Sequence, residues 1–544
     1  MKKYNFLKYI FLFLTICGLA SSCKEDFLER PPLSNLTAGT FFNNDAELST
    51  SSSALYNQVW AGANGQSLLA FGDGRGGNFF TPYVADWLQF CSFAVSNTNG
   101  ALKDSWSSFY NIIAQSNVLI YNIDNYSKPA VSTLAKNTAL GEARYMRGLA
   151  YSFLVQNWGP VPIITDNLKQ GADTTLSRNT VESVWEFAIR DMQYAIAHLP
   201  VTSTSGRLTK YSAKGMLARF YLTRSGLNST NGQRNQMYLD SAKYYAKDVI
   251  MNSPYKLMDN YADLFFTKSN NNSEQLFGLQ WIGLREPWGV GNTFQSQFAA
   301  NSTITGGSDG WGGGHGASAD YVLNLDPIDS IRRKATYMFP GDYYPELNRK
   351  GGGWAQPIPN ASTYSNIAHF KKYIVGTPED NGGGQVQATG NNTYMQRLAD
   401  VYFIYAEAIL GNNTTTTDPE ALKYFNAVRN RAGLPSVTSI NIDKILHERR
   451  YEFAVEGDAW YDIIRLYYYN PTKAKAIINA QQKGEYKIDI KPGTYANGRI
   501  REFTTTILVP RSFTVNDATM FLPYPDTEIA MAPNLLKPPV PYKF

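Results

Sequence analysis

The sequence predicts a mainly α-helical protein in which paired helices support one large, loop-rich and partly β insertion. Apolar residues recur at helical spacing in several segments, and short turns join neighbouring segments. The helical spacing stops between residues 253 and 392, where glycine and asparagine tracts alternate with short strand-like pieces. The composition is 43% hydrophobic and 14% aromatic, which is ample for a large core. We expect a globular protein with elaborate surface loops.

The first residues indicate export. A lysine-rich start is followed by an apolar run over 9–17 and by the small residues Ala20, Ser21 and Ser22 before Cys23. This is the arrangement of a secretory signal peptide rather than a membrane span. Residues 20–23 also resemble a lipobox, in which the cysteine becomes the acylated first residue of the mature protein. We predict that residues 1–22 are a lipoprotein signal peptide and that Cys23 is the lipid anchor; ordinary secretion with cleavage near Ser22 is the alternative.

The rest of the chain limits its location and its partners. Lys24, Glu25 and Asp26 follow the predicted anchor, and such a charged tether favours the outer face of an outer membrane. The formal charge of +5 includes the signal-peptide lysines, so the mature chain is close to neutral, which argues against nucleic acid as a partner. No window after residue 22 is apolar enough to span a bilayer. Cys91 is then the one remaining free cysteine, which excludes an internal disulfide.

The helical spacing gives the order of the elements. Helices are predicted at 106–120, 140–155, 181–199, 211–222, 237–250, 395–410, 420–432 and 442–467. Asp418-Pro419 is a favourable helix start. Similar helices joined by short turns are typical of tetratricopeptide-like units. We divide the mature chain into an N-terminal helical part (23–252), an insertion (253–392) with a strand-like segment at 275–281, and a C-terminal helical part (393–544).

A series of short motifs runs along nearly the whole chain. They are WSSFYNII at 106–113, GEARYMRGLAY at 141–151, WGPVP at 158–162, RLADVY at 397–402, VRNRAGL at 428–434, ERRYEF at 448–453 and LPYP at 522–525. In this order, behind a lipobox, they resemble the SusD/RagB family of nutrient-binding outer-membrane lipoproteins. One departure is the C-terminus, which reads KPPVPY at 537–542 where family members often end in an Asn-Pro-Gly-Tyr-like turn.

The resemblance implies a fold with about four tetratricopeptide-like helix pairs and an irregular ligand-binding region. It also implies a non-catalytic, surface-exposed protein that captures oligosaccharides and delivers them to a SusC-like TonB-dependent transporter. Peptide or glycopeptide capture on the same scaffold is an alternative. A surface glycoside hydrolase, or a scaffold that binds the transporter alone, is a further alternative.

Charged residues are interpreted as structural. Glu448, Glu452 and Glu456 follow at four-residue spacing, which places neighbouring Cβ atoms about 5–6 Å apart on a helix. Carboxylates on one helix face cannot flank a sugar ring as those of a glycosidase do, and adjacent arginines would keep them ionised. We therefore predict an inter-helix ion network. Its other members are Arg449, Arg450, Asp462, Arg465, Glu142, Arg144, Arg147, Arg397, Asp400 and Glu407.

Formal matches to catalytic and cofactor motifs lack the required surroundings. The segment 306–310 fits G-x-S-x-G, but neither a strand nor a helix flanks it. The segment 72–77 fits G-x-G-x-x-G, but the residues after it do not open a helix. The histidines show no metal-binding spacing. We expect no catalytic residues and no cofactor; a structural calcium ion stays open, although no D-x-[DN]-x-[DN]-G pattern supports it.

Aromatic residues in loops are the candidate binding residues. The flat faces of Trp and Tyr stack on the C–H faces of sugars, while amide, carboxylate and guanidinium groups bind the hydroxyls. The predicted ligand-binding residues are Asp73, Arg75, Tyr83, Trp87, Trp288, Trp311, Tyr321 and Trp354, with Tyr343 and Tyr344 nearby. Trp87 and Trp311 are the first choices. Trp106 and Trp158 lie within helical packing motifs and are assigned to the core.

Overall fold

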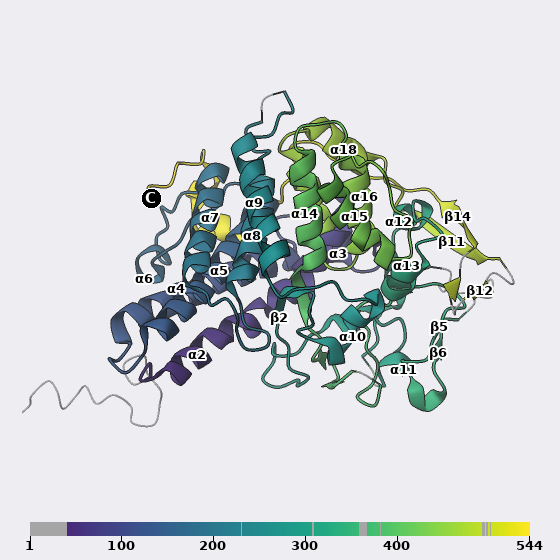
Figure 1. Cartoon of the computed structure of the whole chain (residues 1–544), viewed down its shortest axis with the longest axis horizontal. Helices are drawn as coiled ribbons and strands as arrows, with labels where there is room; N and C mark the ends of the chain where they lie inside the picture. Colours follow the sequence, from purple (N-terminus) through teal and green to yellow (C-terminus); the bar gives the residue numbers. More distant parts are fainter. Residues whose placement is uncertain are drawn as a thin grey trace, which may run out of the picture.

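The computed structural model describes residues 41–229, 231–306, 309–357, 367–380, 382–491, 495–496, 499–500 and 502–544. It is mainly α-helical, which confirms the predicted fold class. Two groups of long helices lie side by side, and the short strands and loops of the insertion lie below them in the view of Figure 1. The predicted signal peptide and Cys23 fall outside the described residues, as do residues 307 and 308 of the G-x-S-x-G match.

The first helical group confirms the predicted N-terminal helices. It consists of α4 (Gly100–Tyr126), α5 (Thr133–Trp158), α7 (Val181–His198), α8 (Lys210–Arg224) and α9 (Gln236–Asn252). α4 packs on α5, α5 on α7, α7 on α8 and α8 on α9. Each begins after a residue whose side chain accepts a backbone N–H of the first turn, namely Asn99, Ser132, Thr180, Thr209 and Asn235. Shorter helices α2 (Asp45–Ser53), α3 (Ala85–Ser92) and α6 (Asn167–Gln170) accompany this group.

The second helical group joins the first through the packing of α14 on α9. It consists of α14 (Leu398–Leu410), α15 (Pro419–Arg431), α16 (Ile442–Glu452), α17 (Ala459–Tyr467) and α18 (Pro471–Asn479). Asp418 begins α15 as predicted, because its side chain accepts the backbone N–H groups of Glu420 and Ala421. The predicted helix at 395–410 is shorter than expected, because its first residues belong to a strand.

The single helix predicted over 442–467 is wrong. The chain breaks between α16 and α17, where Val455 and Gly457 have φ values of 65° and 86°. These left-handed conformations cannot continue a helix. The backbone N–H of Gly457 donates instead to Asp73, at 2.6 Å. Glu456 therefore lies in the turn rather than on the helix face that carries Glu448 and Glu452.

The insertion contains short strands and short helices. The predicted strand is β2 (Gln275–Leu279), which pairs antiparallel with β10 (Thr393–Arg397). A four-stranded sheet has the order β1 (Phe79–Phe80), β3 (Gly316–Ala317), β7 (His369–Phe370) and β4 (Tyr337–Met338). The helices are α10 (Phe294–Phe298), α11 (Ser302–Thr305), α12 (Ala319–Leu323) and α13 (Ser330–Thr336). The insertion also contains the short strands β5 (Tyr343–Tyr344), β6 (Trp354–Ala355), β8 (Gly384–Gln385) and β9 (Ala388–Thr389). After the second helical group come β11 (Glu485–Ile490), β12 (Tyr495–Ala496), β13 (Arg499–Ile500), β14 (Phe503–Val509) and α19 (Asp526–Met531).

The glycine-rich segment 72–77 is a packing seam. A Cβ atom added at Gly72 would lie 2.0 Å from the carbonyl oxygen of Gly457, and one at Gly76 would lie 2.5 Å from Cβ of Ala459. The glycines therefore let this segment touch the backbone before α17, which is a structural reason for the spacing that resembles a phosphate-binding loop. Trp106 and Trp158 are buried and pack edge to face, which confirms their assignment to the core. In the part of the chain that the structure covers, no helix has both the length and the hydropathy to cross a bilayer.

Candidate functional site

The structure separates the predicted ligand-binding residues by exposure. Tyr83, Trp288 and Trp311 expose 58%, 54% and 50% of their surface. Trp354 is half-buried, and Trp87 is only 7% exposed. Asp73, Arg75 and Tyr321 are buried. Only exposed rings can stack directly on a ligand, so the first three residues are the strongest candidates.

Asp73 and Arg75, two of the predicted ligand contacts, belong to the interior of the protein. Asp73 accepts hydrogen bonds from the side chain of Asn78 and the backbone of Gly457, both at 2.6 Å. Burial raises the pKa of Asp73 to about 6. Arg75 stacks on Trp460 with its guanidinium carbon 3.8 Å from the ring centroid. Both side chains therefore hold the interior of the fold together.

Tyr321 is also interior. Its ring lies 5.0 Å from that of Tyr337 and 4.8 Å from that of Tyr451. The sequence did not predict this burial, because Tyr321 belongs to the short helix α12, which contacts α16 through Tyr451 and Arg450.

Trp288 stands over a pocket of about 200 Å³ on one side of α10. The pocket is lined by Trp281, Thr293 and Gln297 among others, and by Asn64 from the N-terminal part. The carbonyl oxygen of Trp288 accepts a hydrogen bond from Gln58 Nε2 at 2.9 Å, which ties its loop to the N-terminal part. Sequence reasoning missed the pocket, because Trp281, Asn64 and Gln297 come from three separate segments.

Trp311 belongs to a loop whose backbone is bonded to α10. Its backbone N–H donates to the carbonyl of Ser296 at 3.0 Å, and the next residue, Gly312, donates to Ala299 at 2.9 Å. The ring of Trp87 packs 6.4 Å from that of Phe298, the last residue of α10. Tyr83 contacts the Trp311 loop, because a Cβ atom at Gly314 would lie 2.6 Å from its ring. We call Tyr83, Trp87, Trp288 and Trp311 the α10 aromatic group.

Trp354 belongs to a separate hairpin. It pairs with Tyr344 across β5 and β6, and its indole N–H lies 3.4 Å from Gln356 Oε1. Tyr343, on the same hairpin, donates its hydroxyl hydrogen to the carbonyl of Gly352 at 2.7 Å. These contacts are local to the hairpin, so we leave Trp354 out of the α10 aromatic group.

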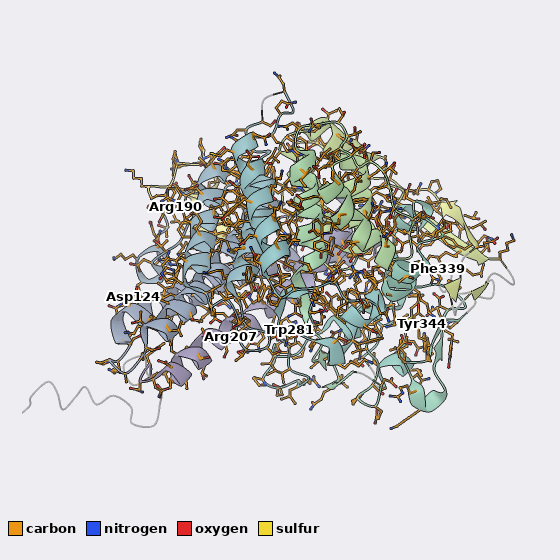
Figure 2. All side chains as sticks on the ribbon, in the orientation of Figure 1. Asp124, Arg190, Arg207, Trp281, Phe339 and Tyr344 are labelled. Atoms are coloured by element: carbon orange, nitrogen blue, oxygen red, sulfur yellow. The ribbon has the colours of Figure 1, made fainter. Side chains whose placement is uncertain are left out.

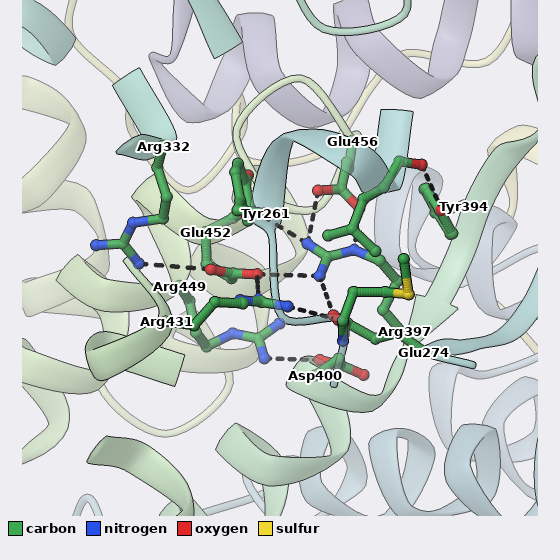
Figure 3. A network of polar contacts seen from close by, with 12 residues as sticks. Tyr261, Glu274, Arg332, Tyr394, Arg397, Asp400, Arg431, Arg449, Glu452 and Glu456 are labelled. Atoms are coloured by element: carbon green, nitrogen blue, oxygen red, sulfur yellow. Dashed lines mark hydrogen bonds and ion pairs between the residues drawn. The ribbon is translucent and has the colours of Figure 1, made fainter. Parts of the chain in front are cut away.

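The predicted ion network is confirmed (Figure 3). Arg397, fully buried, reaches Glu274 at 2.5 Å, Glu452 at 3.0 Å and Glu456 at 2.8 Å. Burial by itself raises the pKa of Glu452, but the guanidinium groups of Arg431 and Arg397 outweigh it and hold that pKa below its usual value. A carboxyl group kept ionised in this way cannot act as the proton donor that a glycosidase needs.

The other predicted charged residues form similar pairs between helices. They are Arg147–Asp191, Arg144–Asp191, Glu142–Arg207, Asp400–Arg449, Glu448–Arg429, Asp462–Arg449, Glu407–Arg465 and Arg450–Asp320. Within the described ranges, no three His, Cys, Asp or Glu side chains are grouped so that they could hold a metal ion.

Comparisons with known proteins agree with this architecture. A family model described as "SusD family" matches residues 218–540, and one described as "Starch-binding associating with outer membrane" matches residues 26–222. A SusD-like protein of Bacteroides ovatus is 38% identical over 97% of this chain and 97% of its own length. The chain belongs to the SusD family.

Two solved structures give the same result in three dimensions. One crystal structure has a TM-score of 0.85 and 36% identity, covering 93% of this chain and 100% of the other. Another, determined with xylogluco-oligosaccharide, has a TM-score of 0.82 and 36% identity, covering 91% of this chain and 99% of the other. The helical framework of this SusD-family protein is thus shared with these structures over almost its whole length.

Proposed function

We propose that this SusD-family protein is a non-catalytic receptor that binds a neutral oligosaccharide on the α10 aromatic group. The observation that carries the proposal is the pair of half-exposed indoles, Trp288 and Trp311, in two loops that both adjoin the short helix α10. An indole ring offers a wide apolar face to the C–H face of a sugar at little cost in conformational entropy. The buried ring of Trp87 packs against Phe298 and His315 and so holds α10 and the Trp311 loop in place.

Polar groups beside the indoles suit hydroxyl recognition. Gln297 Oε1 lines the Trp288 pocket region and has no hydrogen-bond partner among the described residues. Asn64, in the same pocket, is already paired, because its Oδ1 accepts from Thr393 at 2.7 Å and its Nδ2 donates to Asn292 at 3.3 Å. Gln297 is therefore the amide that a glycan hydroxyl can pair with, and Arg285 is the charged residue of the lining. A xylogluco-oligosaccharide is the first ligand to test, because a 36% identical protein was crystallised with one.

The location and the partner are part of the same proposal. We place the receptor on the outer face of the outer membrane through acylated Cys23, where it passes its ligand to a SusC-like TonB-dependent transporter. The match to a family described as associating with the outer membrane supports this location, and the lipobox-like sequence before Cys23 supports the anchor.

The proposal is tested by calorimetry on the soluble protein from Lys24 onward, against neutral xylogluco-, cello- and laminari-oligosaccharides and a set of peptides. Binding of a neutral glycan is expected, and Trp288→Ala and Trp311→Ala should each weaken it at least about tenfold. Tyr244→Ala is the matched control, because Tyr244 is exposed on α9 and lines no part of the Trp288 pocket.

Three outcomes would contradict the proposal. Equal binding by both tryptophan variants and the wild type would remove the α10 aromatic group from the site. Binding of peptides alone would favour peptide capture. Release of shorter oligosaccharides by the purified protein would show a hydrolase.

A further inference from the structure

A second pocket, of about 230 Å³, lies between the loop at 201–206 and the segment 271–277. The loop connects α7 to α8, and the segment enters strand β2, so parts of the N-terminal helices and of the insertion form opposite walls. Arg207 and Trp281, labelled in the lower middle of Figure 2, mark the loop end and the strand end of this region. We call it the β2 pocket.

The walls of the β2 pocket are rich in hydroxyl and amide groups. These side chains are Thr202, Ser203, Thr204, Ser205, Thr209, Tyr255, Asn271, Asn272 and Gln275. The one charged lining residue, Arg207, is neutralised by Glu142, to which it donates at 2.9 and 2.5 Å. The pocket therefore offers many hydrogen-bonding groups without a net charge, which suits a neutral polyhydroxylated molecule better than an ion.

Gln275 leaves one acceptor of the pocket lining unsatisfied. The side chain is only 7% exposed, and its Nε2 donates to Asn271 at 2.9 Å. Its Oε1 is buried and has no hydrogen-bond partner among the described residues. An unpaired buried acceptor typically costs about 1–3 kcal/mol, so such a group calls for an explanation. A hydroxyl donor brought by a ligand would supply the missing partner after a small shift of the amide.

An uncharged chain of hydrogen bonds joins the β2 pocket to the Trp288 pocket. Asn271 donates to Gln280 at 3.0 Å, and Asn392 donates to both of them. The indole N–H of Trp281, which lines the Trp288 pocket, donates to Thr393 at 3.0 Å. The backbone N–H of Trp281 also donates to Asn392 at 3.4 Å, so these hydrogen bonds lead from residues that line one pocket to a residue that lines the other.

The loop at 201–206 is held in place by a close contact between Gly206 and Gln280. Gly206 has a φ of 82°, and a Cβ atom there would lie 2.4 Å from Gln280 Oε1. Only glycine satisfies both the conformation and the close approach. The hydroxyl-bearing residues 202–205 are thus held next to Gln280.

We propose that the β2 pocket is a second carbohydrate subsite, which takes one neutral sugar ring. This inference rests on the proposed function, because it assumes that neutral glycans are the ligands. The volume of the pocket is below the range of about 300–1,000 Å³ for cavities that hold drug-sized ligands, and fits a single ring rather than a longer segment. Tyr255 supplies an aromatic wall, and the hydroxyl and amide groups supply the polar contacts.

The test removes the main site first. Saturation-transfer NMR on a Trp288→Ala/Trp311→Ala double variant should show residual, weak binding of a neutral xylogluco-oligosaccharide. Adding Ser205→Trp, which fills the pocket from its exposed loop, should abolish that signal, and Thr202→Ala/Ser203→Ala should reduce it. Thr174→Trp, in another exposed loop, is the control and should leave the signal unchanged. Thermal unfolding of each variant shows that it is folded.

The outcomes separate the two proposals. If the wild-type protein binds no neutral glycan, the proposed function fails and the subsite with it. If the wild type binds but the double variant gives no residual signal, the subsite alone is overturned. The same holds if Ser205→Trp and Thr174→Trp change the residual signal equally. Equal residual binding of an acidic oligogalacturonide and the neutral oligosaccharide would also overturn it, because the pocket would then not select an uncharged ligand.

Discussion

The two helical groups, called here the helical body, and the region around α10 differ in the kind of polar groups that they bury. The body buries many charged side chains, and Arg397 alone contacts three buried carboxylates. The Trp288 pocket and the β2 pocket are lined mainly by aromatic, hydroxyl and amide groups, with one arginine in each, Arg285 and Arg207. Buried charges are tolerated where opposite charges are fixed in place, whereas neutral hydrogen-bonding groups can exchange partners without leaving a charge unpaired. The body therefore depends on fixed ion pairs, and the walls of the two pockets depend mainly on neutral groups.

The largest expected effect comes from removing the charge of Arg397, which lies at the centre of the buried ion network. Arg397→Met would leave Glu274, Glu452 and Glu456 without their common partner. The expected loss in the free energy of unfolding is about 3–5 kcal/mol, because three buried carboxylates then share only Arg431, Arg332 and Lys372 as cationic partners among the described residues. Urea denaturation measures it. Lys350→Met is the matched control: its pair with Glu379 is exposed, and the expected loss is below about 1 kcal/mol. Similar losses in the two variants would contradict the distinction.

A second comparison distinguishes the residue of the α10 aromatic group that stabilises the fold from one that we expect to contact the ligand. Trp87→Ala should lower the free energy of unfolding by about 3–5 kcal/mol, because a buried indole packed on Phe79 and Phe298 is lost. Trp311→Ala should change stability by less than about 1 kcal/mol and weaken glycan binding instead. Chemical denaturation and calorimetry on both variants give the two quantities. A large stability loss in Trp311→Ala would show that its ring is part of the core.

The third prediction concerns acid. Burial lowers the pKa of His315 to about 4, against a usual value near 6.5. Between these two values the unfolded chain binds a proton that the folded protein does not, so this histidine makes stability fall as the pH is lowered. The buried carboxyl groups of Asp73 and Asp458 act in the opposite direction, because burial raises their pKa values to about 6 and about 7. The net slope of the wild type is therefore a difference between opposing contributions.

A substitution isolates the histidine contribution. The free energy of unfolding of the wild type relative to His315→Gln should fall by about 2–3 kcal/mol as the pH is lowered from about 6.5 to 4. Urea denaturation at several pH values measures this difference, in which the carboxylate contributions cancel. A pH-independent difference would mean that His315 is protonated as easily in the folded protein as in the unfolded chain. Because His315 donates to or accepts from Thr81 at 2.7 Å, glutamine can keep that contact.

Local patterns predicted most of the framework but little of the site. The apolar spacing predicted α7, α8, α9 and α15 nearly to their ends, and each of these helices begins after a capping residue. The helices predicted at 106–120 and 140–155 are longer in the structure, and α6 was not predicted. The break between α16 and α17 was missed, because it depends on Gly457 meeting Gly72 and Asp73 from nearly four hundred residues away. For the same reason the sequence did not predict the burial of Asp73. Aromatic composition found Trp288 and Trp311, but not Trp281 or Gln297, whose shared pocket exists only after folding.

The smallest expected effect is that of salt on ligand binding. If the α10 region holds a neutral glycan by stacking and neutral hydrogen bonds, the Kd should change less than about twofold between roughly 50 and 500 mM NaCl, because no ion pair is screened. Calorimetry of the wild type with a xylogluco-oligosaccharide measures this. The buried Arg397 cluster should be equally insensitive, since salt screens buried pairs only weakly, so unfolding at both salt concentrations serves as the internal control. A tenfold weakening of binding at high salt would place a charged group in the ligand contact, and Arg285, which lines the Trp288 pocket, would be the first residue to substitute.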